Sequence, residues 1–286
     1  MKFGVELEVI SRDNKGLIAG KLLAEGIDCE VEGYNHRTRP HWKIVTDASI
    51  DSHTPRCPHE FEVVSPILYG ESGLLEAMRV ADILNQNGCD ANKTCGLHVH
   101  IDAEDLEAKQ IANITRAWIR NEWVVDSLIP KSRRANNNHY CKSVLDPEKE
   151  YTREYEGFLF SALDRAERSG RDGIISEVNP GYSEDDRFFK LNLTALRRHN
   201  TVEFRYHSGT VQSEKIKRQV QFCYAFVTKY AEKKLRTTNH ASNTNYRWGL
   251  NKSTNRVLND LVKVLPEGER KDFRNYWKGR QSSLAA

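Results

Sequence analysis

The residues best suited to chemistry are His98 and His100, which alternate with the apolar residues Leu97, Val99 and Ile101. Alternation with a period of two is typical of a strand that has one apolar and one polar face. Both imidazoles would then point to the same side of a sheet, two residues apart. Such a pair is typical of metal or phosphate binding, although a strand with a solvated polar face has the same pattern.

Carboxylates follow the same alternation on other predicted strands. They are Glu6 and Glu8 in the first strand, Glu60 and Glu62 in a later one, and Glu203, followed by Arg205, in a third. Any single pair is more typical of the solvated face of an antiparallel strand. Because side chains on a strand have fixed directions, three such strands together with the histidine strand favour one shared polar site.

These residue types indicate which chemistry the site would perform. Several carboxylates that converge without lysine partners repel one another unless a cation lies between them. Oxygen ligands favour Mg²⁺ or Mn²⁺, and a histidine among them is compatible with either ion. Arg205 lies on the same predicted strand face as Glu203, where its guanidinium suits the charge of a phosphoryl group. The pattern therefore predicts metal-dependent phosphoryl transfer.

The composition narrows the class of protein. The chain has 286 residues, of which 38% are hydrophobic and 29% charged, enough for a folded core. Lysine and arginine number 43 against 40 acidic residues, an excess too small to indicate nucleic-acid binding through bulk charge. No signal peptide and no membrane-spanning run are expected. The six cysteines form no Cys-x-x-Cys pair, which favours reduced thiols and predicts a cytoplasmic protein.

The elements that must position these residues follow from hydrophobic periodicity. Strands are predicted at residues 3–10, 28–32, 41–46, 60–66, 96–102, 187–193 and 201–207. Helices are predicted at 15–25, 73–86, 104–128, 150–168, 213–235, 255–264 and 267–278, with a loop or lid at 171–186. The candidate site residues run from Glu6 to Glu203, so residues 1–235 are expected to form one catalytic domain and 236–286 a helical C-terminal appendage.

Several short motifs follow one another in a specific order between about residues 3 and 225. They are Gly4-Val5-Glu6-Leu7-Glu8, Asp47-Ala48-Ser49, Glu60-Phe61-Glu62-Val63-Val64-Ser65-Pro66, Gly96-Leu97-His98-Val99-His100-Ile101, Ser132-Arg133-Arg134, and residues 201–210. Each motif is weak alone, but together they resemble the putative amidoligase family. That family belongs to the carboxylate–amine ligases related to glutamine synthetase and γ-glutamylcysteine synthetase.

The resemblance implies both a fold and a reaction. The fold would be α+β, with a curved antiparallel sheet whose concave face forms an active-site funnel and with helices on the outer face. The reaction would be ATP-dependent. ATP phosphorylates a substrate carboxylate, and an amine then attacks the acyl phosphate to give an amide, ADP and phosphate. The partners would be small-molecule or peptide carboxylate and amine substrates, with ATP and Mg²⁺ or Mn²⁺ as cofactors.

The resemblance also implies a role for each site residue. The metal ligands would be Glu6, Glu8, Glu60, Glu62, His98 and Glu203. The nucleotide and its phosphates would be contacted by His100, Arg187, Arg198 and Arg205. Arg205, Glu203 and His98 would form the catalytic set. The Asp47-Ala48-Ser49 segment is expected to be a turn.

Two other functions are compatible with the same residues. The first is a metal-dependent hydrolase or amidase that uses His98 and His100 as zinc ligands. The dominance of carboxylates over histidines favours the ligase over this alternative. The second is a non-catalytic protein that keeps the fold and binds a peptide or nucleic acid through the polar loop at residues 131–138.

Overall fold

A computed structural model describes residues 1–52, 55–145, 149, 152–180, 184–236, 258–259 and 261–285. The chain divides into two compact units. The first consists of Met1–Asp102 and Glu203–Cys223, and the second of Ala103–Val202 and Tyr224–Ala286. None of the helices that the structure describes is both long and apolar enough to cross a lipid bilayer.

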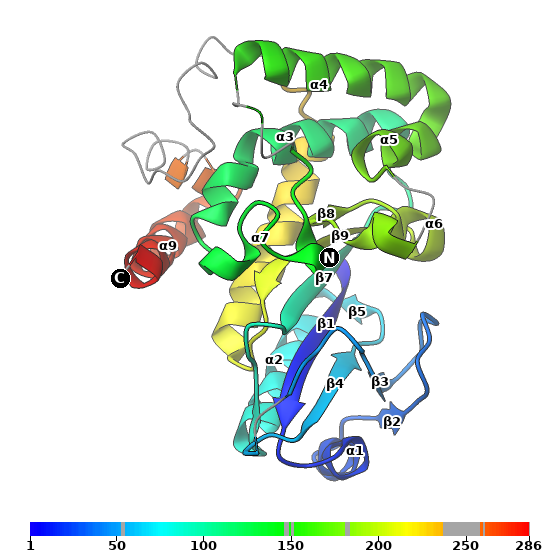
Figure 1. The fold of residues 1–286 in the computed structure, drawn as a ribbon, viewed down its shortest axis with the longest axis vertical. Helices are drawn as coiled ribbons and strands as arrows, with labels where there is room; N and C mark the ends of the chain where they lie inside the picture. Colours follow the sequence, from blue (N-terminus) through cyan, green and yellow to red (C-terminus); the bar gives the residue numbers. More distant parts are fainter. Residues whose placement is uncertain are drawn as a thin grey trace. The chain divides into compact units, whose positions relative to one another are not determined.

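The described residues form an α+β fold with one nine-stranded sheet (Figure 1). Its strand order is β2-β3-β4-β1-β7-β9-β8, and β5 and β6 also pair with β1. β2 and β3 are parallel, whereas β4, β5, β6 and β7 are all antiparallel to β1. The predicted α+β class and the mostly antiparallel pairing are confirmed. The predicted curvature of the sheet into a funnel is not, because the sheet is neither closed nor strongly curled.

The central strand β1, Lys2–Ser11, determines the register of its neighbours. The other strands are β2 (Cys29–Val31), β3 (Trp42–Val45), β4 (His59–Val64), β5 (Leu68–Tyr69), β6 (Cys89–Asp90), β7 (Gly96–Asp102), β8 (Leu191–Asn192) and β9 (Thr201–Ser208). Glu6 of β1 lies opposite Val64 of β4 on one side and His98 of β7 on the other, and Glu8 lies opposite Glu62. Directly opposed residues of antiparallel strands share a face, so this register brings the predicted site residues together.

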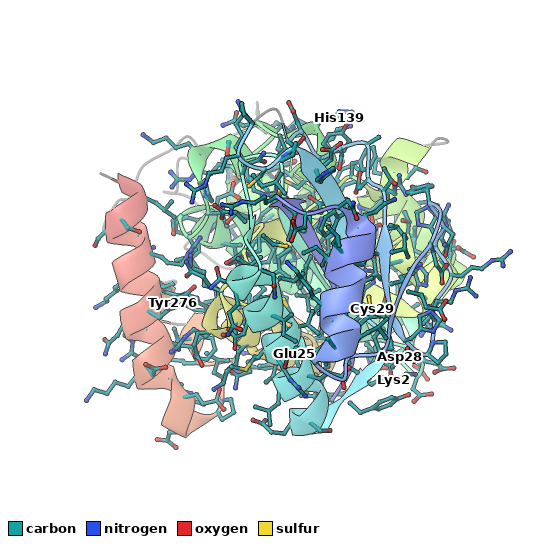
Figure 2. All side chains as sticks on the ribbon, turned by 90° about the horizontal axis from the view of Figure 1, so that it is seen from below. Lys2, Glu25, Asp28, Cys29, His139 and Tyr276 are labelled. Carbon is teal, nitrogen blue, oxygen red and sulfur yellow. The ribbon has the colours of Figure 1, made fainter. Side chains whose placement is uncertain are left out.

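The other face of the sheet is apolar. Its residues include Val5, Leu7, Phe61, Leu97 and Phe204, all with 1% exposure or less. The helices of the first unit are α1 (Lys15–Ala24), α2 (Gly70–Gln86) and the first part of α7 (Ser213–Ala231). Figure 2 shows α1 and α2 side by side, with Glu25 just after the end of α1. The Tyr206 hydroxyl of β9 donates to Gln219 of α7 at 2.9 Å, which attaches that helix to the sheet.

The second unit is mostly helical. It contains α3 (Ala108–Asp126), α4 (Arg153–Ala166), α5 (Gly170–Val178), α6 (Ala195–His199), the end of α7, and α9 (Arg270–Ala285). Short 3-10 turns occur at Lys131–Arg133, His139–Cys141, Glu167–Ser169, Glu184–Arg187 and Glu267–Glu269. The predicted helices at 104–128, 150–168 and 213–235 correspond to α3, α4 and α7. Part of the predicted helix at 255–264 lies outside the described residues.

Two local predictions in the second unit were wrong. Residues 171–186 were predicted as a loop, but α5 occupies much of this range because Ile174, Ile175 and Val178 are buried at helical spacing. The predicted strand at 187–193 is reduced to β8, and α6, followed by a left-handed Asn200 (φ 54°), connects it to β9. Burial of Ala195 and Leu196 accounts for the extra helical turn.

Candidate active site

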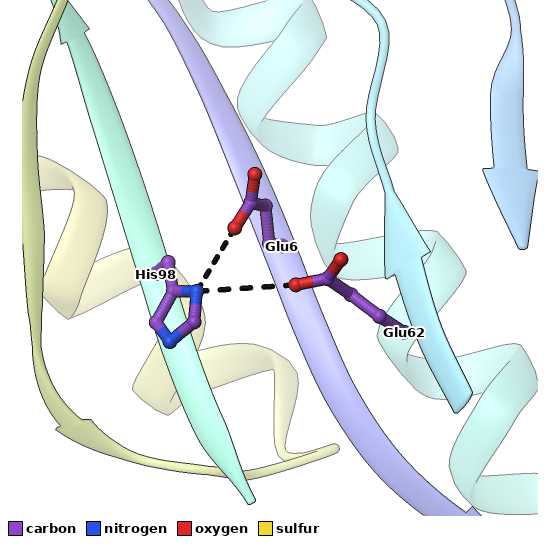
Figure 3. Close-up of side chains that lie close together, drawn as sticks. All are labelled: Glu6, Glu62 and His98. Carbon is purple, nitrogen blue, oxygen red and sulfur yellow. Dashed lines mark hydrogen bonds and ion pairs between the residues drawn. The ribbon is translucent and has the colours of Figure 1, made fainter. Parts of the chain in front are cut away.

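The polar face of the sheet gathers carboxylates, imidazoles and a guanidinium from adjacent strands of the first unit. They are Glu6 and Glu8 of β1, Glu62 of β4, His98 and His100 of β7, and Glu203 and Arg205 of β9. Figure 3 shows Glu6, Glu62 and His98 pointing toward one another from three neighbouring strands, with helices behind the sheet. These residues therefore lie together on one face of the sheet, as their alternation along the strands predicted.

His98 lies at the centre of the group and is 2% exposed. Its Nδ1 is 2.9 Å from Glu6 Oε2, and its Nε2 is 3.2 Å from Glu8 Oε1. The same Nδ1 is 3.9 Å from Glu62 Oε1 and 3.8 Å from Glu203 Oε1. Each ring nitrogen thus faces a carboxylate, which fixes the plane of the imidazole.

His100 and Arg205 lie on the β9 side of this centre. His100 Nε2 is 3.3 Å from Glu6 Oε1 and 3.7 Å from Glu203 Oε1. Arg205 Nη1 donates to Glu203 Oε1 at 2.7 Å and lies 3.4 Å from His98 Nδ1. Because the Arg205 side chain is 11% exposed, its charge acts in a site with little water.

The negative charge of the site is unevenly compensated. Burial raises the pKa of Glu6, but His100 and His98 outweigh this effect and hold it well below its usual value. Burial likewise raises the pKa of Glu203, and Arg205 and His100 bring it below the usual value. Burial together with Glu6, Glu8 and Asp47 raises the pKa of Glu62 well above its usual value. Glu62 is therefore where additional positive charge would stabilise the site most.

The donor atoms are suitably placed for divalent cations. Three groups on this face have ligand atoms within 4.8 Å of one another: Glu6, Glu62 and His98; Glu6, His100 and Glu203; and Glu8, Asp47 and Glu62. Glu6 and Glu62 each belong to two of these groups. Glu8 and Glu62 also lie directly opposite each other on neighbouring strands, a like-charge pairing that is unfavourable without a cation. Carboxylates with few imidazoles fit Mg²⁺ or Mn²⁺.

The structure adds one residue to this site and separates another from it. Asp47, in the loop after β3, was predicted only as part of a turn, and its carboxylate also accepts a hydrogen bond from the Ser49 N–H at 2.7 Å. Its position directly after a predicted strand, within a motif of the amidoligase resemblance, was the available signal. Glu60 lies on the same side of β4 as Glu62 but opposite Ile10, and it belongs to none of the ligand groups among the described residues.

The predicted phosphate contacts Arg187 and Arg198 belong to the second unit. Arg187 ends a 3-10 turn, with its guanidinium carbon 5.1 Å from the centre of the Phe188 ring. Arg198 is an exposed residue of α6. Their roles at the nucleotide remain predictions.

A family model described as "Putative amidoligase enzyme" matches residues 1–227, which include every residue of the candidate site. The chain therefore belongs to this amidoligase family, and membership implies an amide-forming ligase. No curated protein matches the chain.

Proposed function

We propose that this protein is an ATP-dependent carboxylate–amine ligase that forms an amide bond through an acyl-phosphate intermediate. The observation that carries the proposal is the convergence of Glu6, Glu8, Glu62 and Glu203 with two imidazoles and one guanidinium on a single sheet face. In an amidoligase, such a face suits the transfer of a highly charged phosphoryl group. We also propose that residues 1–235 form the catalytic domain, with 236–286 as a helical C-terminal appendage.

The protein side chains first have to bind the nucleotide. Glu6, Glu8, Glu62, His98 and Glu203 would hold Mg²⁺ or Mn²⁺, with Asp47 as a further ligand. Bound divalent cations would supply Lewis acidity and neutralise the phosphate charge. Without them, the carboxylates repel ATP. His100, next to Glu6 and Glu203, would lie by the nucleotide.

Arg205 would have the main role in the chemical steps. An oxygen of the substrate carboxylate attacks the γ-phosphorus, the bond to the bridging oxygen breaks, and ADP leaves. Arg205 is held against Glu203 at 2.7 Å, which orients its guanidinium to stabilise charge on the phosphoryl oxygens. The amine nitrogen then attacks the carbonyl carbon of the acyl phosphate, phosphate leaves, and the nitrogen gives up a proton to form the amide.

The direct test is a screen for ADP release with pairs of carboxylates and amines, in the presence of Mg²⁺ or Mn²⁺. A productive pair should release ADP and amide in equal amounts, and omission of either substrate or of the metal should abolish amide formation. Calorimetry should also show tight ATP binding only with a divalent cation. Metal-independent ATP binding of equal strength, or stoichiometric zinc with amide hydrolysis in the absence of ATP, would contradict the proposal.

A further inference from the structure

We propose that Lys43 of β3 is an internal counter-cation of the carboxylate site, which partly neutralises Glu6 and Glu62 in the metal-free protein and opposes the entry of a divalent cation. This inference rests on the proposed function, because it assigns a role to Lys43 at the same metal site. It concerns positioning and charge, since Lys43 belongs to none of the ligand groups described above.

The register of the sheet places Lys43 in line with the site. Lys43 lies opposite Val64 of β4, Val64 lies opposite Glu6 of β1, and Glu6 lies opposite His98 of β7. Directly opposed residues of antiparallel strands share a face. Lys43, Glu6 and His98 therefore belong to one row across four strands, on the face that carries the carboxylates.

The ammonium of Lys43 is buried and fully hydrogen-bonded, but to neutral acceptors. The residue is 3% exposed. Its Nζ donates to the Asn35 carbonyl at 3.1 Å, to Asn35 Oδ1 at 3.0 Å and to the Arg37 carbonyl at 2.8 Å. Three acceptors match the three N–H groups of a protonated lysine. Among the described residues no carboxylate lies within ion-pair distance of this nitrogen.

A buried charge without a contacting carboxylate is unfavourable unless it is compensated from further away. Burial lowers the pKa of Lys43 below its usual value, and Glu32, Glu6 and Glu62 offset only part of this effect. Two of these three carboxylates are proposed metal ligands. The charge of Lys43 is therefore coupled through space to the residues that a metal ion would bind.

The direction in which removal of Lys43 changes metal affinity distinguishes a charge effect from a purely structural role. Two strand spacings separate the Lys43 and Glu6 backbones, roughly 10 Å. Taking this spacing as the scale of the charge separation, a single positive charge repels a divalent cation enough to weaken its binding about fourfold at the dielectric constant of water. A lysine that merely supported the loop would, when removed, leave metal binding unchanged or weaken it.

The test is Lys43→Met, with Mn²⁺ binding measured by calorimetry in the absence of nucleotide and substrates. We expect Mn²⁺ to bind about fourfold more tightly than to the wild type at low ionic strength. The melting temperature should fall in the metal-free protein and fall less with saturating Mn²⁺. Lys43→Gln removes the charge but keeps N–H donors for the loop carbonyls, and it should show the same tighter binding if the methionine variant does not fold.

Asn35→Ala is the matched control. It removes one acceptor of the Lys43 ammonium and the hydrogen bonds of the Asn35 side chain with Glu32, Gly33 and Arg37. The lysine charge stays in place, so Mn²⁺ affinity should stay at the wild-type value. Unchanged or weaker Mn²⁺ binding by both Lys43 variants would overturn the inference while leaving the ligase proposal intact. A wild-type protein that binds no divalent cation would overturn the proposed function, and the inference with it.

Discussion

Replacement of Arg205 by alanine tests the proposed chemistry most directly. The guanidinium is almost buried and contacts Glu203 at 2.7 Å. If it acts mainly while the phosphoryl group is transferred, its loss should reduce turnover by about 10²–10³, as for removal of one strong transition-state donor. That loss corresponds to roughly 2.7–4 kcal/mol of transition-state stabilisation. The Michaelis constant for ATP should change much less, because ground-state binding does not depend on the interaction to the same degree.

The free energy of unfolding of the same variant gives a second, independent test. Arg205→Ala leaves Glu203 buried next to Glu6 without its guanidinium partner, and breaking a buried ion pair in this way costs about 3–5 kcal/mol. A divalent cation bound by Glu203 would replace part of the missing charge. We therefore expect the loss in melting temperature to be larger in the metal-free protein than with saturating Mn²⁺.

The assay is steady-state ADP release at saturating ATP and substrates, beside thermal unfolding with and without metal. Arg205→Lys serves as the matched variant because it keeps the charge but lacks the planar fork of donors. It should recover part of the stability and little of the turnover. Turnover of both variants within about threefold of the wild type would mean that Arg205 is only a structural partner of Glu203, and it would remove this residue from the mechanism.

Three further predictions concern other parts of the first unit. Glu6→Gln should weaken Mn²⁺ binding by at least about 100-fold in calorimetry, since Glu6 belongs to two ligand groups and removal of a directly bound partner costs at least about 2–3 kcal/mol. The control Glu60→Gln, on the same face but outside those groups, should bind Mn²⁺ like the wild type. The pKa of Glu32 is lowered to about 2, chiefly by a hydrogen bond from an arginine, so Glu32 should contribute stability that is present above pH 4.5 and lost as the pH falls toward 2. The difference in melting temperature between wild type and Glu32→Gln should shrink over that range, and a constant difference would contradict the shift. Gly209→Ala should destabilise the protein by about 1–3 kcal/mol in chemical denaturation, because a Cβ there would lie 2.5 Å from a cysteine Cβ. In the control Gly20→Ala, the added Cβ would meet nothing within 4 Å, so this variant should be as stable as the wild type or more stable.

The faces of the strands could be predicted from the sequence, but the neighbours of each side chain could not. Alternation is a local property, and it correctly placed Glu6, Glu62 and His98 on polar faces. Which strands pair, and in which register, depends on contacts between distant segments. For this reason Glu60 was expected beside the other carboxylates although its partner is Ile10, and Asp47, which lies in a loop without periodicity, was not expected among them.

Glycines lie at the start of a helix in the second unit that was predicted as a loop. Gly170 adopts a positive φ of 73° just before the regular part of α5. Gly173 is required for close packing, because a Cβ at this position would lie 2.3 Å from the Ala166 carbonyl oxygen. A glycine that permits close contact between helices has the same sequence signature as one that ends a helix, so only the tertiary structure distinguishes them.

The arrangement of β1 and β4 shows why the site and the fold cannot be optimised independently. Ser65 holds the end of β4 against β1 by accepting a hydrogen bond from the Val5 N–H at 2.9 Å and donating its own N–H to the Val5 carbonyl at 3.0 Å. That register places Glu8 directly opposite Glu62, and the Gly96 N–H donates to Glu8 and keeps its carboxylate in place. Rotation of the Glu8 carboxylate away from Glu62 would therefore break its hydrogen bond with a backbone N–H. The fold therefore keeps negative charges close together, which is unfavourable, and a bound cation would be held more tightly because it relieves their repulsion.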